Sequence, residues 1–344
     1  RCGQPAVLAS SGVSLKLALC KRSNSRKPFS AGRCAPRRSQ TGVLLDQPVG
    51  AYGQVEERIV RGELERRWRG TGFGTTSVLS DNLRSIEANN YTSQFVRDKI
   101  NEIVDDPAVA KLLEPHDYPI GTKRLALDTN YYATYNRENV KLVSVRDTPI
   151  ERFTPAGIVV DGTEYEFDAI VLATGFDAAT GALDRIQFEG TDGRTLTDAW
   201  AEGAKSYLGL AVEGFPNFFT VTGPGCPAIL TNVIASIEHH VEWIADYITH
   251  MRAEGITRAE ATPEAQEAWV AHVAELAAMT LYPTAASWYM GANVPGKPRV
   301  FLAYVGGLHN YRDRCDQLAA DGYQGFTHSS NGAPLKSDQI AVGA

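Results

Sequence analysis

The chain has 344 residues, of which 43% are hydrophobic and 22% are charged, and its formal net charge is −6. This length suits one large domain or two linked domains with a substantial core. No run approaches 18 consecutive apolar residues, so the sequence excludes a membrane-spanning helix. The five cysteines have no metal-like spacing. This argues against a disulfide scaffold and a metal site, and it favours a reducing, cytoplasmic location.

The positive charge is concentrated at the beginning of the chain. Residues 1–40 contain nine Lys or Arg residues and no acidic residue, which leaves 25 basic and 40 acidic residues in 41–344. Such a start is compatible with a targeting sequence or a nucleic-acid-binding arm. It has no sustained apolar period, however, and it begins with Arg1 instead of Met. We therefore interpret residues 1–45 as a disordered or non-native leader joined to a genuine C-terminal portion, and we expect no nucleic-acid or membrane partner.

Residues 46–121 are expected to be helical. Apolar residues recur there three or four positions apart, which is typical of amphipathic helices. The two runs are Val55, Ile59, Val60, Leu64 and Trp68, and then Phe95, Val96, Ile100, Ile103 and Val104. Between them, Gly70–Gly74 resembles a phosphate-binding loop, but it follows a charged helical run instead of a strand. We interpret it as a turn between helices.

Strands are expected in the second half of the chain. The segments are 140–145, 157–160, 165–167, 217–222 and 299–305. A turn at Asp161-Gly162 joins the second of these to the third. The apolar run Phe167–Ala173 is interpreted as a buried parallel strand, and its carboxyl end is a place where ligands bind in open α/β sheets.

Three further helices have clear sequence signals. A long one is expected over 231–253, with Val233, Ile234, Ile237, Val241, Ile244, Ile248 and Met251 on one stripe. Gly255 ends it, and helices at 263–279 and 308–320 follow. We interpret His239 and His240 as structural or solvated, and residues 327–344 as a flexible tail. The preceding loop Gly223–Ala228 formally matches a dinucleotide-binding glycine pattern, but its two prolines remove N–H donors that a pyrophosphate needs.

Two adjacent cations, Lys123 and Arg124, follow a turn at Gly121. They are either a solvated pair or the ligands of a dianionic phosphate or a developing anion, for which Lys serves as a point charge and Arg as a planar fork.

Eight segments together resemble the flavin-dependent Baeyer–Villiger monooxygenases, in particular the phenylacetone and cyclohexanone monooxygenases. They are Gly121–Arg124, Tyr131–Tyr132, Asn136–Val140, Ala173–Asp177, Tyr207–Leu210, Gly223–Pro227, Trp288 and Gly291–Lys297. The resemblance implies NADPH- and FAD-dependent conversion of ketones to esters or lactones through a peroxyflavin, with molecular oxygen as the second substrate. In such enzymes the cofactor supplies the organic chemistry and the protein supplies position and charge.

The resemblance also implies roles for individual residues. Arg124 matches the catalytic arginine, Lys123 the residue that reads the 2′-phosphate of NADPH, and Trp288 a contact of the nicotinamide nucleotide. Val233 matches a flavin contact. The flavin would also be lined by Ala173, Thr174, Gly175, Phe176 and Asp177. The ketone pocket would be bounded by Pro227, Ala228, Ile229 and Leu230.

The departures from the family are informative as well. Complete members carry two strand–glycine–helix motifs, one for FAD and one for NADPH, and neither is present in this sequence. We therefore expect an α/β fold that is an incomplete glutathione-reductase-like flavoprotein with two dinucleotide-binding domains and a helical insertion. Its parts would be residues 122–176 of the NADPH domain and residues 177–326 of the FAD domain. We also expect the 344 residues to be inactive alone and unable to hold FAD.

Three alternatives stay open. One is a heteroatom-oxidising flavin monooxygenase. The second is a flavin disulfide reductase, which the absence of a redox-spaced cysteine pair disfavours. The third is a non-catalytic fragment whose helical region binds other chains.

Overall fold

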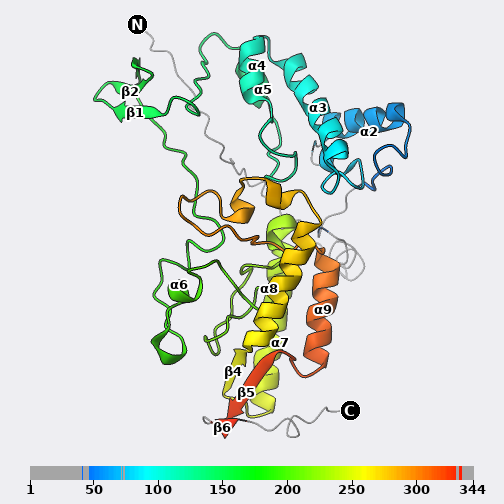
Figure 1. The fold of residues 1–344 in the computed structure, drawn as a ribbon, viewed down its shortest axis with the longest axis vertical. Coiled ribbons are helices and arrows are strands. Elements are labelled where there is room, and N and C mark those ends of the chain that lie inside the picture. The colour runs from blue at the N-terminus through cyan, green and yellow to red at the C-terminus, as the bar shows by residue number, and fades with distance from the viewer. Residues whose placement is uncertain (1–40, 42–45, 71, 73, 331–332, 335–344) are drawn as a thin grey trace, which may run out of the picture. The chain divides into compact units, whose positions relative to one another are not determined.

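The computed structural model describes residues 41, 46–70, 72, 74–330 and 333–334, and these residues belong to two compact units (Figure 1). The boundary between the units falls between Phe176 and Asp177. Nearly all of the basic leader lies outside the described residues, so its interpretation stays a prediction. None of the described helices is long and apolar enough to cross a membrane.

The first unit contains the expected helices. They are α2 (Glu57–Arg69), η1 (Thr75–Ser77), α3 (Ile86–Ile103), α4 (Pro107–Leu113) and α5 (Tyr131–Thr134). Ser85 caps α3 by accepting the Ala88 N–H, and Asp106 caps α4 in the same way. α2 ends at its C-cap Gly70, and the short helix η1 follows from Thr75. The predicted helices are therefore confirmed, while residues 71 and 73 of the predicted turn Gly70–Gly74 lie outside the described residues.

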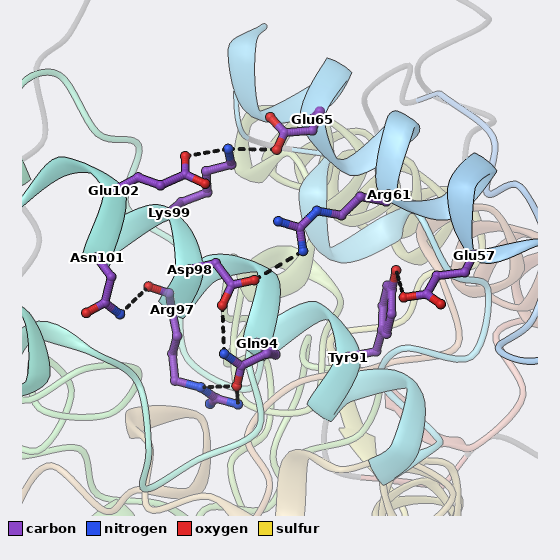
Figure 2. Close-up of polar contacts among 10 residues, drawn as sticks. All are labelled: Glu57, Arg61, Glu65, Tyr91, Gln94, Arg97, Asp98, Lys99, Asn101 and Glu102. Atoms are coloured by element: carbon purple, nitrogen blue, oxygen red, sulfur yellow. Dashed lines mark hydrogen bonds and ion pairs between the residues drawn. The ribbon is translucent and has the colours of Figure 1, made fainter.

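The two long helices of this unit are held by an apolar core and by charged groups at its rim. Leu64, Phe95 and Ile100 are fully buried. Figure 2 shows that α2 and α3 are also joined by ion pairs: Arg61 Nη1 lies 3.1 Å from Asp98 Oδ2, and Lys99 Nζ lies 2.7 Å from carboxylate oxygens of Glu65 and Glu102. Because Lys99 is largely buried, its contacts with two carboxylates order the pair of helices more than an exposed ion pair does.

One buried cation connects the turn after α2 with the start of the unit. The guanidinium of Arg67 donates to Ser77 Oγ and to the carbonyl oxygens of Gly74 and Gln47, and it is paired with Glu63. Pairing with Arg66 and Arg67 lowers the pKa of Glu63 to about 2. A buried Arg is stable only when its donors are satisfied in this manner.

A small antiparallel sheet ends the first unit. Its strands are β1 (Ile150–Phe153), β2 (Gly157–Val160) and β3 (Thr163–Glu166), in the order β1-β2-β3. The predicted turn at Asp161-Gly162 is confirmed, and both of its residues have a positive φ. β1 was not expected, since its sequence does not alternate between apolar and polar residues.

Two strand predictions in this unit are wrong. Residues 140–145 form no strand beyond one isolated bridge position, and Phe167–Ala173 belongs to no strand ladder among the described residues. Val171 is 85% exposed and Leu172 is 67% exposed. A strand exists only when a neighbour pairs with its backbone, and an apolar run does not supply that neighbour.

The second unit is built around three helices that lie beside one another in Figure 1. They are α7 (Val233–Ala253), α8 (Pro263–Ala278) and α9 (Leu308–Ala320), and all three confirm predicted helices. Asn232 caps α7 and Thr262 caps α8. The core between them is aromatic and includes Trp243, Tyr247, Trp269, Tyr311 and Tyr323.

The second unit has its own small antiparallel sheet and several short helices. The strands are β4 (Arg258–Ala261), β5 (Phe326–Ser330) and β6 (Ala333–Pro334), and the short helices are η2 (Thr191–Gly193), α6 (Leu196–Ala199), η3 (Ala228–Leu230), η4 (Tyr282–Thr284) and η5 (Trp288–Met290). β5 extends into the segment that we expected to be a flexible tail. That prediction is wrong for residues 327–330, because their backbone pairs with β4.

Two more expected strands are absent from the second unit. Residues 217–222 and 299–305 make only isolated bridges. The second segment is held by three separate backbone bonds, from Gly225 N–H to Leu302 O, from Leu302 N–H to Tyr289 O and from Tyr304 N–H to Cys226 O. It therefore joins two loops instead of extending a sheet.

The buried face of α7 differs from the predicted apolar stripe. Ile234 is 63% exposed and Val241 is 50% exposed, whereas His239, His240 and Trp243 are buried. His240 is accepted in the core because both of its ring nitrogens find hydrogen-bond partners there. His239 and His240 are therefore structural, as expected.

Candidate functional site

The predicted cation pair lies at the end of a tight turn in the first unit. Thr122 is fully buried, and its N–H and hydroxyl both donate to the carbonyl of Pro119, at 3.1 Å and 2.6 Å. Gly121 has φ +90°, in the region that favours glycine. Beyond this turn, Lys123 Nζ lies 4.2 Å from the centre of the Tyr118 ring, and the side chain of Arg124 is exposed. The turn therefore presents two cations from a fixed backbone.

Two further motif segments, Tyr131–Tyr132 and Asn136–Val140, also belong to the first unit and contact its helices or lie in them. Burial raises the pKa of Tyr132 to about 12, so its hydroxyl stays neutral. Tyr131 and Tyr132 pack edge to face, with ring centroids 5.4 Å apart. Asn136 accepts the Asp105 N–H and donates to Ile103 O, which secures the end of α3. Three of the eight motif segments thus depend on the helices that precede them.

The segment expected to line the flavin is divided by the boundary between the units. Ala173, Thr174, Gly175 and Phe176 end the first unit, and Phe176 is 93% exposed. Asp177 begins the second unit, where its carboxylate forms a partly buried ion pair with Lys297. Gly181 lies so close to Asp177 that an added Cβ would be 2.4 Å from the aspartate Cβ. The structure thus brings Asp177 onto the Gly291–Lys297 loop, which is 120 residues away in the chain.

Trp288 lies at the beginning of that loop. It is half-buried, and its ring centroid is 4.5 Å from that of the buried Tyr289. Gly291 has φ +69°, and an added Cβ would approach Pro298 O to 2.9 Å. The loop therefore closes on itself, with Tyr289 in the core and part of the Trp288 ring accessible.

The residues expected to bound the ketone pocket form a short turn before α7. Pro227 and Ala228 are buried, and Ile229 and Leu230 are half-buried. Val233, in the first turn of α7, is 45% exposed. Of these residues, Ile229, Leu230 and Val233 retain surface that a bound molecule can contact.

The glycine-rich loop before this turn is not a phosphate cradle. The Gly223 N–H donates to Gly209 O and the Gly225 N–H donates to Leu302 O. The two donors that the glycine pattern offers are therefore used inside the protein, which agrees with the sequence interpretation.

A buried histidine fixes the start of the same loop. His240 Nδ1 accepts the Thr222 N–H at 2.9 Å, so its other nitrogen carries the proton and donates to the Tyr311 hydroxyl at 2.9 Å. The Tyr311 hydroxyl in turn donates to Leu208 O at 2.6 Å. Burial lowers the pKa of His240 to about 4, and it raises the pKa of the neighbouring Cys226 and Cys315 thiols to about 12. These thiols are inert, and the histidine is a neutral connector.

The sequence did not identify every residue that shapes these segments. It singled out Lys123, Arg124 and Trp288, but it missed the support of the cation turn by Asn89. Its donors reach Asn82 O and Ile120 O. Its helical neighbours Ser85, Thr92 and Ser93 are polar, so apolar spacing offered no signal that this amide is buried.

No protein-family model matches the chain. Among curated proteins, it is 49% identical to the acetone monooxygenase (methyl acetate-forming) of Gordonia sp. over 69% of this chain and 45% of that protein. It is 44% identical to a Baeyer–Villiger monooxygenase of Pseudooceanicola batsensis, over 75% of this chain and 47% of that protein. It is 40% identical to the phenazine N-monooxygenase of Lysobacter antibioticus, over 84% of this chain and 53% of that protein.

The solved structures that resemble this chain are also monooxygenases. A steroid monooxygenase bound to NADP has a TM-score of 0.81 at 43% identity, covering 87% of this chain and 56% of that chain. OTEMO in complex with FAD and NADP has a TM-score of 0.81 at 38% identity, covering 86% of this chain and 55% of that chain. The chain is a homologue of the Baeyer–Villiger monooxygenases. This confirms the resemblance that the motifs indicate, over about half the length of the curated relatives it matches.

The neutral His240 predicts a pH-dependent stability of the second unit of this monooxygenase homologue. Above pH 6.5 the His240 ring is neutral in both the folded and the unfolded chain. As the pH falls from about 6.5 to 4, the ring is protonated in the unfolded chain but stays neutral in the folded protein. The free energy of unfolding should fall by up to about 3 kcal/mol over that range. Urea unfolding, followed by Trp243 and Trp269 fluorescence at pH 7 and 4.5, measures this loss.

The matched variant is His240→Asn, whose side-chain oxygen can still accept the Thr222 N–H and does not titrate. Burial also lowers the pKa of His328 and His272, so the variant should keep part of the pH dependence. An equal pH dependence in the variant and the parent would contradict this account.

The Asp177–Lys297 ion pair predicts a measurable coupling between its two segments. Its side chains are only 29% and 16% exposed, so a double-mutant cycle with Asp177→Asn and Lys297→Met should give about 1 kcal/mol. The exposed pair of Lys205 and Glu267 is the control, and it should give less than about 0.5 kcal/mol. Equal coupling energies for the two pairs would show that the contact does not join Asp177 to the loop.

Proposed function

We propose that this chain is part of an NADPH- and FAD-dependent monooxygenase that inserts an oxygen atom next to a ketone carbonyl and forms an ester or a lactone. The observation that carries the proposal is the rigid turn that presents Lys123 and Arg124 together. Residues 46–121 would be the helical insertion, 122–176 part of the NADPH domain and 177–326 part of the FAD domain of an α/β flavoprotein. Relatives named for ketone oxidation, and related structures that hold NADP or FAD, support this proposal.

The cation turn fits the adenine nucleotide of NADPH. The 2′-phosphate carries two negative charges, and Lys123 is a flexible point charge within a half-buried turn. Arg124 stays charged at every physiological pH, so it can stabilise negative charge that develops on the reacting groups. We propose Trp288 as the contact of the nicotinamide nucleotide.

The fit to FAD is incomplete. We propose that Val233 and residues 173–177 contact the flavin, and that Pro227, Ala228, Ile229 and Leu230 bound the ketone. When bound, the flavin would accept a hydride from NADPH and activate molecular oxygen. The described residues hold no strand–glycine–helix cradle for its pyrophosphate, however.

The missing pyrophosphate cradle has a consequence for the isolated chain. We propose that these 344 residues do not retain FAD unaided, and that their catalytic activity alone is absent. We also propose a cytoplasmic location, which the buried free thiols of Cys226 and Cys315 support.

Oxidation of a heteroatom is the second candidate. A relative named as a phenazine N-monooxygenase is as similar to this chain as several ketone-oxidising relatives. The acetone monooxygenase, at 49% identity, favours the ketone. A chain with a binding role alone is the third candidate.

The nucleotide assignment makes a direct prediction for Lys123. The chain lacks the strand–glycine–helix motif for NADPH as well, so we expect weak binding of both nucleotides, with NADP⁺ bound more tightly than NAD⁺. Lys123→Ala should weaken NADP⁺ binding about tenfold or more with little change for NAD⁺, because it removes a charged donor to the phosphate. Titration of tryptophan fluorescence measures both affinities. Lys141, which also lies over a tyrosine ring in this unit, provides the control Lys141→Ala. A wild-type chain without preference for NADP⁺ would contradict the assignment.

The reaction class has its own test. The chain is mixed with excess FAD and desalted, and its visible spectrum is recorded. We expect a colourless protein. Retained flavin bands would contradict the proposed loss of FAD binding, and they would allow ketone, amine and sulfide turnover to be compared by product analysis. Formation of an ester, with a decrease of at least about 100-fold in Arg124→Ala, would then support the ketone reaction. Oxidation of nitrogen or sulfur alone would support the second candidate.

A further inference from the structure

Asn89 ends the first turn of α3 and is completely buried. Its Nδ2 donates to Asn82 O and to Ile120 O, both at 2.9 Å. Its Oδ1 accepts the Ile120 N–H at 2.8 Å and the Ser93 hydroxyl at 3.2 Å. One side chain thus satisfies both backbone groups of Ile120, which is 31 positions further along the chain.

These four contacts use the whole hydrogen-bonding capacity of the side chain. A primary amide has two N–H donors and an oxygen with two lone pairs. Its orientation is also determined, since a flipped amide would place its oxygen against two carbonyl oxygens. An ionised Asp would offer no donor, and an apolar residue of similar size would leave the buried groups of Ile120 without partners. Asparagine is therefore required by the geometry of this position.

Ile120 stands directly before the turn that carries the cations. Its side chain is part of the apolar core of the first unit, and its backbone is held by Asn89. The next residue, Gly121, is packed so closely that the position has no room for a side chain: an added Cβ would lie 3.1 Å from Leu83 Cδ2. The bond from Thr122 to Pro119 closes the turn. The backbone that leads to Lys123 and Arg124 is thus fixed from within the helical segment.

We propose that Asn89 is a positioning residue that holds the Gly121–Arg124 turn in the orientation in which Lys123 and Arg124 meet a nucleotide phosphate and the reacting groups. The proposal rests on the function proposed above for these two cations. It gives the helical segment a task beyond packing, because a charged group displaced by about 1 Å loses much of its effect on a bound ligand. Asn89 acts through the turn and does not itself contact the nucleotide.

Amide hydrogen exchange of the full chain tests the structural half of this proposal without a ligand. Asn89→Leu and Asn89→Asp should lower the protection of the Ile120 and Thr122 amides by about tenfold or more at pH 7, because each loses the donors to two carbonyls. Protection at Thr222, in the second unit, should not change. Asn101→Leu is the matched control on the same helix, since the Asn101 side chain lies at the surface and bonds to Arg97 O and Glu114 (Figure 2 shows Asn101 beside Arg97).

The ratio of NADP⁺ to NAD⁺ affinity tests the functional half. A loss of folded protein lowers both affinities equally, whereas a displaced Lys123 lowers the ratio. We expect the Asn89 variants to lower the ratio about tenfold, toward that of Lys123→Ala. If Asn89→Leu removes protection along all of α3, Asn89→Ser, a smaller polar variant, takes its place in both measurements.

The outcomes of the two measurements distinguish the role of Asn89 from the function of the cation pair. Unchanged protection at Ile120 and Thr122, or lost protection with an unchanged affinity ratio, would overturn the role of Asn89 alone. A wild-type chain that does not distinguish NADP⁺ from NAD⁺ would refute the proposed function of the cation pair. Lost protection together with a lowered ratio, and neither effect in Asn101→Leu, is the expected result.

Discussion

The motif loops of this chain depend on hydrogen bonds that buried helix side chains make to loop backbone. Asn89 on α3 bonds both backbone groups of Ile120, and His240 on α7 accepts the Thr222 N–H. Tyr311 on α9 donates to Leu208 O, and Trp269 on α8 donates to Gly225 O. Backbone polar groups that leave solvent must be paired, and here side chains supply the pairs that a sheet provides elsewhere.

The need to pair backbone polar groups explains which apolar segments are buried and which stay at the surface. Residues 302–304 have no strand partner along their length, yet their backbone bonds to residues 225, 226 and 289. The run at 170–172 receives no such support from the described residues, and its side chains are exposed. Apolar side chains alone therefore do not decide burial, because each segment also needs partners for its N–H and C=O groups.

The sequence predicted the helices well and the strands poorly, for a physical reason. Helices are specified locally, by a cap such as Ser85 or Thr262 and by apolar spacing, so α3, α8 and α9 were found. A strand depends on a neighbour that can lie far away in the chain, so the unalternating β1, β4 and β5 were missed and 217–222 was overpredicted. The buried face of α7 was also missed, because His240 is buried through partners that apolar periodicity does not reveal. Lys123, Arg124 and Trp288 were found by resemblance, while Asn89 became visible only through its contacts.

Amide hydrogen exchange of the unmodified chain, read residue by residue, tests the central claim that helix side chains hold the motif loops. The account predicts strong protection of the Ile120 and Thr222 amides, which lie outside helices and strands but donate to Asn89 and His240. It predicts no protection at residues 170–172. Rapid exchange at Ile120 and Thr222, or strong protection of 170–172, would contradict it.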